Sequence, residues 1–196
     1  MIDYLIDDCS GVILAGGKNT RYGGFHKAFL RVENQFIIEN TLNILKSIFN
    51  DNFIIANNKV IFSKYQLPVY SDIFFNRGPI GGIHSALQHT SKKSIFVVSC
   101  DMPFIDKSII LKMYEKFKSS NRNACVPKHD NNIEPLHSIY SKEILKDLEN
   151  HLQNSEDNAI YKFLSTIDIE YLNFESSKQE FVNINSPEDL ELLNKL

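Results

Sequence analysis

Short apolar runs alternate with segments of helical periodicity through the first 120 residues, and this alternation limits the fold more than any other feature. The run SIFVVS at 94–99 is the strongest expected strand, because its middle is apolar throughout. Alternating strands and helices predict a mostly parallel sheet with helices on both faces and right-handed crossovers. Further strands are expected at 11–15, 53–56 and 68–71, and helices at 38–49, at 79–90 and after Asp106, which should cap the third helix.

From about residue 121 the pattern is looser. Ser186-Pro187-Glu188-Asp189 resembles a capped helix start with proline at the first helical position, followed by a leucine stripe. No linker or repeat divides the chain, so we expect one α/β domain over residues 1–196, with a nucleotide-type unit at about 1–120 and a substrate-side extension at about 121–196. The elements expected in the extension are strands at 124–127, 135–141 and 168–174 and helices at 142–151 and 156–166.

Composition excludes several classes of protein. The 196 residues carry a formal net charge of −3, which gives no general reason to expect nucleic-acid binding. The three cysteines are far apart and form no C-x-x-C pair, which argues against a disulfide framework or a zinc knuckle. No signal peptide and no bilayer-spanning run are evident. We therefore expect a soluble cytoplasmic protein that binds neither nucleic acid nor membrane.

The stretch LAGGKNTRYGGFHK, residues 14–27, concentrates glycine and positive charge directly after the first expected strand. Ligands of open parallel sheets bind beyond the carboxyl ends of the strands, which is where this stretch lies. Gly16 and Gly17 permit a tight turn and close ligand approach, while Arg21 and Lys27 can contact phosphate oxygens. The spacing matches neither the Walker loop nor G-x-G-x-x-G. A surface loop with solvated charges is the alternative interpretation.

Two carboxylates follow other expected strands. Asp101 comes directly after 94–99 and is predicted either to bind Mg²⁺ together with substrate phosphates or to form a turn. Asp72 ends the strand at 68–71 and could accept hydrogen bonds from a base or ribose, or be a turn residue. The glycine-rich stretch GPIGGIHSAL, 78–87, opens a helix whose N-terminus favours an anion or a closely packed base. Three such elements at one sheet edge predict a ligand site.

These motifs resemble those of the molybdenum cofactor guanylyltransferases. LAGGKNTRYGGFHKAFL, GPIGGIHSAL, SCDMPF, IEPLHSIYS and NINSPEDL occur in the family's order, from about residue 11 to the C-terminus. The first motif is shared with many nucleotidyltransferases, whereas its combination with NINSPEDL is narrower. The resemblance implies a Rossmann-like sheet of nucleotidyltransferase type, with a nucleotide-binding half and an acceptor-side half. It also implies a reaction in which GTP and molybdenum-bound molybdopterin give a guanine dinucleotide cofactor and pyrophosphate.

The resemblance also implies roles for matching residues and partners for the protein. Arg21, Lys27 and Asp101 would be catalytic, and Asp101 would hold Mg²⁺. Transient contacts with molybdenum cofactor biosynthesis proteins and recipient enzymes are expected. The residues implied to contact the nucleotide are Leu14, Ala15, Gly16, Gly17, Lys27, Asn58, Asp72, Gly82 and Asp101, and those implied to contact the acceptor are Asn183 and Asn185.

Some positions depart from the family or leave alternatives open. Ala56 stands where a nucleotide-contacting asparagine can occur, and either Asn57 or Asn58 could replace it. His26 is expected to be a solvated loop residue, and the isolated histidines His84 and His137 receive no role. L-A-G-G in place of L-A-A-G favours GTP over CTP. The alternative functions are transfer by a related enzyme that uses CTP or a sugar phosphate, and binding of nucleotide or cofactor without catalysis.

Overall fold

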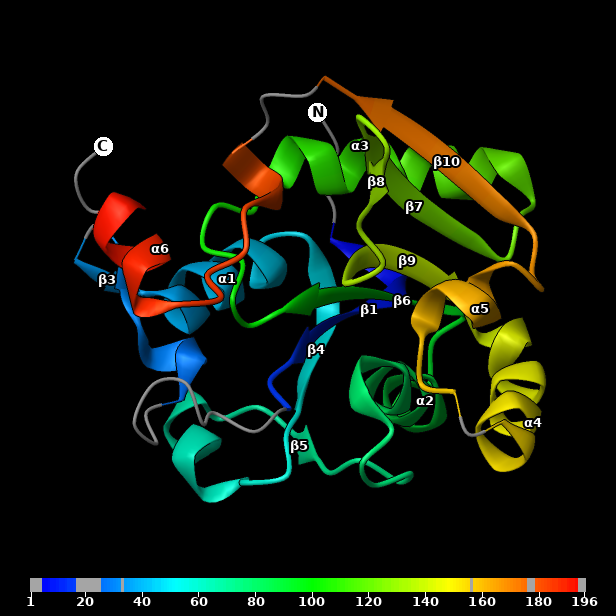
Figure 1. Cartoon of the computed structure of the whole chain (residues 1–196), viewed down its shortest axis with the longest axis horizontal. Helices are drawn as coiled ribbons and strands as arrows, with labels where there is room; N and C mark the ends of the chain where they lie inside the picture. The colour runs from blue at the N-terminus through cyan, green and yellow to red at the C-terminus, as the bar shows by residue number, and fades with distance from the viewer. Residues whose placement is uncertain (1–4, 17–25, 33, 156, 176–178, 194–196) are drawn as a thin grey trace.

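The structure is a computed structural model that describes residues 5–16, 26–32, 34–155, 157–175 and 179–193. One continuous sheet forms the centre of the molecule (Figure 1), and its main strand order is β10-β7-β9-β6-β1-β4-β5, with β8 paired to β7. The sheet strands are β1 (Ile6–Leu14), β4 (Phe49–Ile55), β5 (Val69–Tyr70), β6 (Ser94–Ser99), β7 (Ala124–His129), β8 (Asn132–Ile133), β9 (His137–Ser141) and β10 (Ile169–Phe174).

The sheet is mostly parallel, as predicted. β1 pairs in parallel with both β4 and β6, β4 with β5, and β7 with β10. β9 runs antiparallel between β6 and β7. Strands from both halves of the sequence therefore join a single sheet. Because β1, β6 and β7 all run in the same direction, Leu14, Ser99 and His129 end at the same edge of the sheet.

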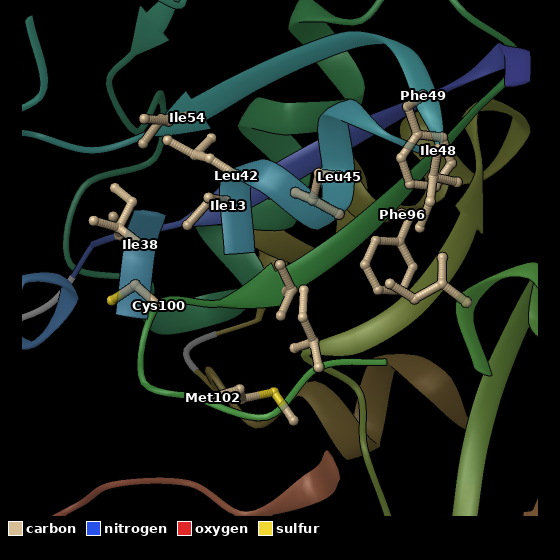
Figure 2. Packing of buried hydrophobic residues seen from close by; sticks show 14 of the residues in the cluster. Ile13, Ile38, Leu42, Leu45, Ile48, Phe49, Ile54, Phe96, Cys100 and Met102 are labelled. Atoms are coloured by element: carbon tan, nitrogen blue, oxygen red, sulfur yellow. The ribbon is translucent and has the colours of Figure 1, made fainter. Parts of the chain in front are cut away.

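Helices cover both faces of this sheet (Figure 1). The helices α1 and α3 contribute buried residues to one apolar cluster, and α2, α4 and α5 to the other. Figure 2 shows the first cluster, in which Ile38 and Leu42 of α1 pack beside Ile13 of β1, while Phe96 of β6 stacks on Phe49 of β4. The helices are α1 (Ile37–Lys46), α2 (Gly78–His89), α3 (Lys107–Ser120), α4 (Leu145–Asn154), α5 (Ile160–Leu164) and α6 (Pro187–Leu193).

Local signals predicted several boundaries correctly. The strand β6 spans the expected residues 94–99. Asp106 caps α3, because its Oδ1 accepts hydrogen bonds from the backbone N–H groups of Ser108 and Ile109 at 2.8 and 3.1 Å. At the start of α6, Asp189 accepts hydrogen bonds from the Ser186 backbone N–H and donates its own N–H to the Ser186 hydroxyl, which forms a reciprocal cap.

Other predictions were wrong in detail. Phe49 was assigned to the helix at 38–49, yet α1 ends at Lys46 and Phe49 begins β4, where it pairs with Ile6. The helix expected at 142–151 divides into a 3₁₀ turn, η4 (Lys142–Ile144), and α4. A small hairpin of β2 (Arg31–Val32) and β3 (Gln35–Phe36) was not predicted, because two-residue strands carry no periodicity. No helix in the described part of the chain is long and apolar enough to cross a bilayer.

Candidate active site

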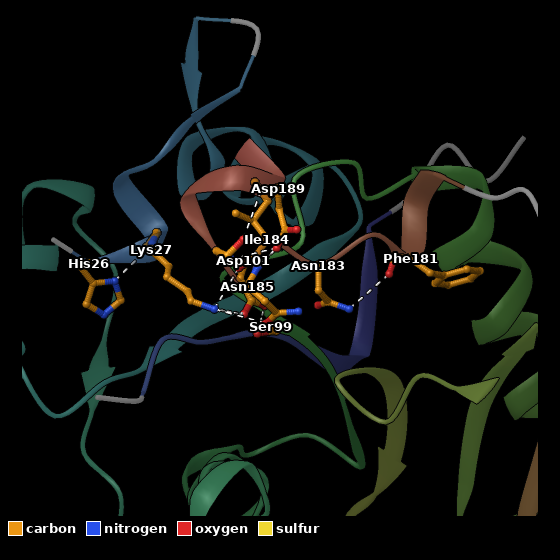
Figure 3. A network of polar contacts seen from close by, with 11 residues as sticks. His26, Lys27, Ser99, Asp101, Phe181, Asn183, Ile184, Asn185 and Asp189 are labelled. Atoms are coloured by element: carbon orange, nitrogen blue, oxygen red, sulfur yellow. Dashed lines mark hydrogen bonds and ion pairs between the residues drawn. The ribbon is translucent and has the colours of Figure 1, made fainter. Parts of the chain in front are cut away.

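Lys27 and Asp101 form an ion pair at the shared edge of β1 and β6. Lys27 opens the 3₁₀ turn η2 (Lys27–Phe29), and its Nζ lies 3.1 Å from Asp101 Oδ2. Both side chains are mostly buried, with 20% and 17% exposed. Lys27 Nζ also donates to the Ile184 carbonyl at 2.9 Å and lies 3.5 Å from Asn185 Oδ1 (Figure 3). One ammonium group thus joins the glycine-rich stretch, the end of β6 and the C-terminal segment.

Two further hydrogen bonds hold Asp101 at this edge. The Ser99 hydroxyl donates to Asp101 Oδ1 at 2.5 Å, and the Ile184 backbone N–H donates to the Asp101 carbonyl at 2.9 Å. Asn183 donates to the Phe181 carbonyl at 3.2 Å, so its side chain lies along the same segment (Figure 3). The predicted acceptor-side asparagines therefore lie beside the predicted metal ligand. Asn183 and Asn185 are more than 80 residues from Asp101 in sequence, and the backbone hydrogen bond between Ile184 and Asp101 holds the two segments together.

Asp72 lies just beyond β5, two residues after its end. Its Oδ2 accepts from Asn57 Nδ2 at 2.9 Å, and its backbone N–H donates to Asn57 Oδ1 at 3.1 Å. Its Oδ1 is buried and has no hydrogen-bond partner among the residues that the structure describes. Burial raises the pKa of the Asp72 carboxyl, and the Asn57 hydrogen bond partly opposes that rise. A buried acceptor of this kind is suited to a ligand donor.

Two predicted glycines flank this carboxylate. A Cβ added at Gly16 would lie 3.6 Å from Asp72 Oδ2, and one added at Gly82 would lie 3.8 Å from Asp72 Oδ1 and 3.4 Å from Leu14 Cδ2. Both glycines therefore leave space in front of Asp72 that a side chain would narrow. Residues from β1, β5 and α2 meet here, so the fold brings Leu14, Gly16, Asp72 and Gly82 together.

His26 is not the solvated residue that was expected. It is half-buried, and its ring lies edge-on to Phe62 with centroids 5.2 Å apart. Its Nδ1 accepts from the Ala28 N–H at 3.2 Å, so its Nε2 carries the proton and donates to the Ala15 carbonyl at 3.0 Å. Burial lowers the pKa of His26, and the bond to Ala15 opposes this. This hydrogen bond therefore connects Ala15 and His26, the residues on either side of positions 16–25.

The remaining predicted residues are placed as follows. Arg21 and Gly17 lie outside the described residues. Asn57, rather than Asn58, hydrogen-bonds to Asp72, although both asparagines are exposed. His84 and His137 are buried, and burial lowers the pKa of His137 to about 3. Ser99 and His26 were not predicted as site residues. The Ser99 hydroxyl bonds a carboxylate only two residues away, so its place at the end of β6 was the available signal. The partner of His26, the Ala15 carbonyl, lies 11 residues away in sequence.

The donors at Asp101 are compatible with Mg²⁺. Within the described residues, no group of three or more His, Cys, Asp or Glu side chains is placed to hold a metal ion. Mg²⁺ commonly uses one or two carboxylates and completes its coordination with substrate phosphates and water. Asp101 supplies one carboxylate at the edge where Lys27 also lies. These residues therefore fit an ion that arrives with a nucleotide.

Solved structures with the same fold define the class of protein. The molybdopterin-guanine dinucleotide biosynthesis protein A of Archaeoglobus fulgidus is 25% identical, has a TM-score of 0.82, and matches over 95% of this chain and 97% of its own. The CMP:2-keto-3-deoxy-manno-octonic acid synthetase, solved with CTP, has a TM-score of 0.75 at 10% identity and matches over 96% and 97% of the two chains. The fold is that of the α/β nucleotidyltransferases.

Sequence comparisons narrow the class to a family. The family model described as the MobA-like NTP transferase domain matches residues 11–169. A probable molybdenum cofactor guanylyltransferase of Clostridium perfringens is 35% identical over 95% of this chain and 96% of its own. A molybdenum cofactor guanylyltransferase of Syntrophotalea carbinolica is 30% identical over 93% and 89%. The chain belongs to the MobA-like NTP transferase family.

Proposed function

We propose that this protein transfers GMP from GTP to the terminal phosphate of molybdenum-bound molybdopterin and releases pyrophosphate. Family membership and the names of its relatives support this activity. The structural observation that carries the proposal is the contact of Lys27 with both Asp101 and Ile184. This contact supports the proposal because it holds the glycine-rich stretch, the end of β6 and the C-terminal segment at one point, as a transfer between two substrates requires. In this proposal residues 1–120 bind the nucleotide and residues 121–196 bind the acceptor.

The nucleotide lies against β1, β5 and the start of α2 in this proposal. Leu14, Ala15, Gly16 and Gly82 form the wall that its base and ribose approach, and Gly17 and Asn58 are also assigned to nucleotide binding. Asp72 accepts from the N1–H and N2–H donors of guanine. Its buried Oδ1 supports this role, since a base without those donors leaves the carboxylate unpaired. This unpaired group is the physical reason for preferring GTP to CTP.

The reaction requires positioning and charge neutralisation more than a protein nucleophile. An oxygen of the acceptor's terminal phosphate forms a bond to the α-phosphorus of GTP. The bond from that phosphorus to the bridging oxygen of the β-phosphate breaks, and pyrophosphate leaves with the electron pair. Lys27 stabilises charge on the phosphates, and Arg21 is assigned the same task on the transferring group. Mg²⁺, held by Asp101, neutralises phosphate charge when it is bound.

The acceptor side is assigned to the C-terminal segment. Asn183 and Asn185 flank Ile184, whose carbonyl accepts from Lys27. Amide side chains at this position can donate to an anionic acceptor and accept from its ring nitrogens. The activity also accounts for the proposed cytoplasmic location and for transient contacts with other proteins of cofactor synthesis and delivery, which must supply the acceptor and receive the product.

A pyrophosphate-release assay with each of the four nucleoside triphosphates, with and without molybdenum-bound molybdopterin, tests this function. We expect release with GTP and Mg²⁺ only when the acceptor is present. An Asp101→Asn variant with unchanged thermal unfolding should lose pyrophosphate release, because it lacks the carboxylate assigned to Mg²⁺. Faster release with CTP, or release driven by a sugar phosphate, would reassign the substrate. GTP binding without product under all acceptors would show a binding protein instead.

A further inference from the structure

A second hollow lies on the acceptor-side half of the sheet and is separate from the residues described above. It measures about 600 Å³ and is bounded by the β7–β8 hairpin, α5 and β10. Two aromatic rings, one ammonium group, two amides and one aliphatic side chain surround it. Its lining residues are Lys128, Asn131, Asn132, Ile133, Tyr161 and Tyr171.

The strand register places this hollow at the same edge of the sheet as the active site. Phe96 of β6 pairs with Ile139 of β9, which in turn pairs with Cys125 of β7, so these residues form one row. Ser99 and Lys128 each lie three residues further along strands that run in the same direction. They are therefore level with each other and two strand spacings apart, about 10 Å. Ser99 is the residue whose hydroxyl holds Asp101.

Two of the lining residues lie on the face of the sheet that bears the Ser99 side chain. Val97 and Val126 both pack into the cluster beneath α2, α4 and α5. Side chains alternate between faces with a period of two, so Ser99 and Lys128 lie on this face as well. Tyr171 pairs with Val126 in parallel register and shares the face. Because β10 is the next strand after β7, Tyr171 lies one strand spacing further from Ser99 than Lys128 does.

The chemistry of the lining suits a flat, polar ring with an anionic group. Tyr161 and Tyr171 are unusually exposed for large aromatic side chains, at 59% and 45%. Exposed phenol rings provide surfaces on which planar heterocycles stack. The amides of Asn131 and Asn132 can donate to and accept from ring nitrogens and carbonyls, and Lys128 adds a positive charge.

We propose that this hollow, formed by Lys128, Tyr161 and Tyr171 with the β7–β8 hairpin, binds the pterin ring system of the acceptor while its phosphate end lies at Lys27 and Asp101. The inference rests on the proposed function for the identity of the acceptor. The ring stacks on the tyrosines and the hairpin amides contact its polar edge. The acceptor then has a second point of attachment beyond Asn183 and Asn185, and its phosphate is aimed at the nucleotide.

Replacement of the two tyrosines tests this assignment. In Tyr161→Ala/Tyr171→Ala, we expect the KM for the acceptor to rise at least tenfold, while kcat at saturating acceptor and the Kd for GTP stay unchanged. Tyr161→Phe/Tyr171→Phe keeps both aromatic faces and should restore most of the affinity. Lys128→Met should raise the acceptor KM, whereas Lys46→Met, an exposed lysine at the end of α1, should not.

Direct binding separates this inference from the proposed function. A 6-substituted pterin phosphate, followed through its own fluorescence, should bind the wild-type protein and lose affinity in the double alanine variant. If the wild type releases no pyrophosphate but binds this probe through the tyrosines, the proposed function fails and the pocket stands. An unchanged acceptor KM and unchanged probe binding in the alanine variant would overturn the pocket. Equal losses for GTP and probe would also overturn it, because they indicate a general structural defect.

Discussion

The Lys27 ammonium lies 3.1 Å from the Asp101 carboxylate and 2.9 Å from the Ile184 carbonyl. The same charge therefore links two segments separated by 157 residues in sequence and neutralises the carboxylate assigned to Mg²⁺. In the proposed function, a phosphate of the nucleotide would replace Asp101 as the partner of Lys27, and Mg²⁺ would replace Lys27 as the partner of the Asp101 carboxylate.

The first prediction concerns removal of this charge. Lys27→Met leaves the mostly buried Asp101 carboxylate without its cation and the Ile184 carbonyl without a donor. We expect the free energy of unfolding to fall by about 1–3 kcal/mol and GTP turnover to fall about 10²–10³-fold. Urea unfolding and steady-state pyrophosphate release measure the two effects. Lys64→Met removes a much more exposed pair with Glu39 and should change stability by less than about 1 kcal/mol. Wild-type turnover in Lys27→Met would contradict the assigned role.

The second prediction separates two adjacent glycines of α2. A Cβ at Gly82 meets only ordinary contacts and points toward Leu14 and Asp72, whereas a Cβ at Gly81 would lie 2.9 Å from the Phe74 carbonyl oxygen. Gly82→Ala should keep the fold, because alanine favours a helix by about 1 kcal/mol over glycine, and should weaken GTP binding. Gly81→Ala should lower stability by about 1–3 kcal/mol.

Circular-dichroism melting and GTP calorimetry on both glycine variants distinguish the two effects. The opposite pattern, with Gly82→Ala unstable but competent in binding, would show that the space before Asp72 is structural. It would also remove the reason for assigning Gly82 to the nucleotide.

The third prediction follows from the buried, unpartnered oxygen of Asp72. Asp72→Asn removes a charge that burial disfavours, so stability at neutral pH should rise by about 1 kcal/mol, while GTP affinity should fall about 10- to 100-fold. The folded protein holds the Asp72 proton more tightly than the unfolded chain does, because burial raises this pKa. The free energy of unfolding of Asp72→Asn should therefore exceed that of the wild type increasingly as pH rises above about 3.8, and the difference should level off above the raised pKa.

Denaturant titrations between pH 3 and 8 test the sign for Asp72. Asp157→Asn is the matched control with the opposite expectation. Hydrogen bonding to Lys162 lowers the pKa of Asp157, so its removal should reduce stability at neutral pH and have no such effect at low pH. A stability difference for Asp72→Asn that does not change with pH would show that its charge is not the cause.

Much of the fold was predictable because its signals are local. The middle of β6 is apolar throughout, and the Asp106 cap bonds residues two and three positions away. Phe49 shows where local spacing fails. It continues the helical stripe of α1, yet its backbone pairs with Ile6 across the sheet. Pairing with a distant strand therefore overrides the spacing, since sheet formation depends on partners that periodicity does not record.

The sequence indicated which residues gather at the carboxyl edge of the sheet, but not which of them contact one another. Asp72, Asp101 and Lys27 follow from their positions after strands or within a charged glycine-rich stretch. Which asparagine faces Asp72 depends on how the chain turns after β4, and the structure selects Asn57. The contact of His26 could not be predicted either, because its acceptor, the Ala15 carbonyl, lies 11 residues away in sequence.

The fourth prediction tests His26 as the residue that positions Lys27. His26→Asn can still accept from the Ala28 N–H as a helix cap, but its shorter side chain cannot reach the Ala15 carbonyl. We expect GTP turnover to fall about 10- to 100-fold, with a smaller loss of thermal stability than in His26→Ala because the cap is kept. His26→Ala loses both bonds and should be less stable. Equal turnover in the wild type and His26→Asn would show that the bond to Ala15 is dispensable.

The same comparison has a pH signature, because the histidine titrates and the asparagine does not. Burial lowers the pKa of His26, so the folded protein binds this proton less tightly than the unfolded chain. The stability that His26 contributes is present above pH 6.5 and is lost as pH falls through the lowered pKa. His84, His89 and His137 have lowered pKa values too, but they are common to both proteins and cancel in the difference. The unfolding free energy of the wild type relative to His26→Asn should therefore decline below pH 6.5, and parallel pH profiles would refute the bonded, neutral ring.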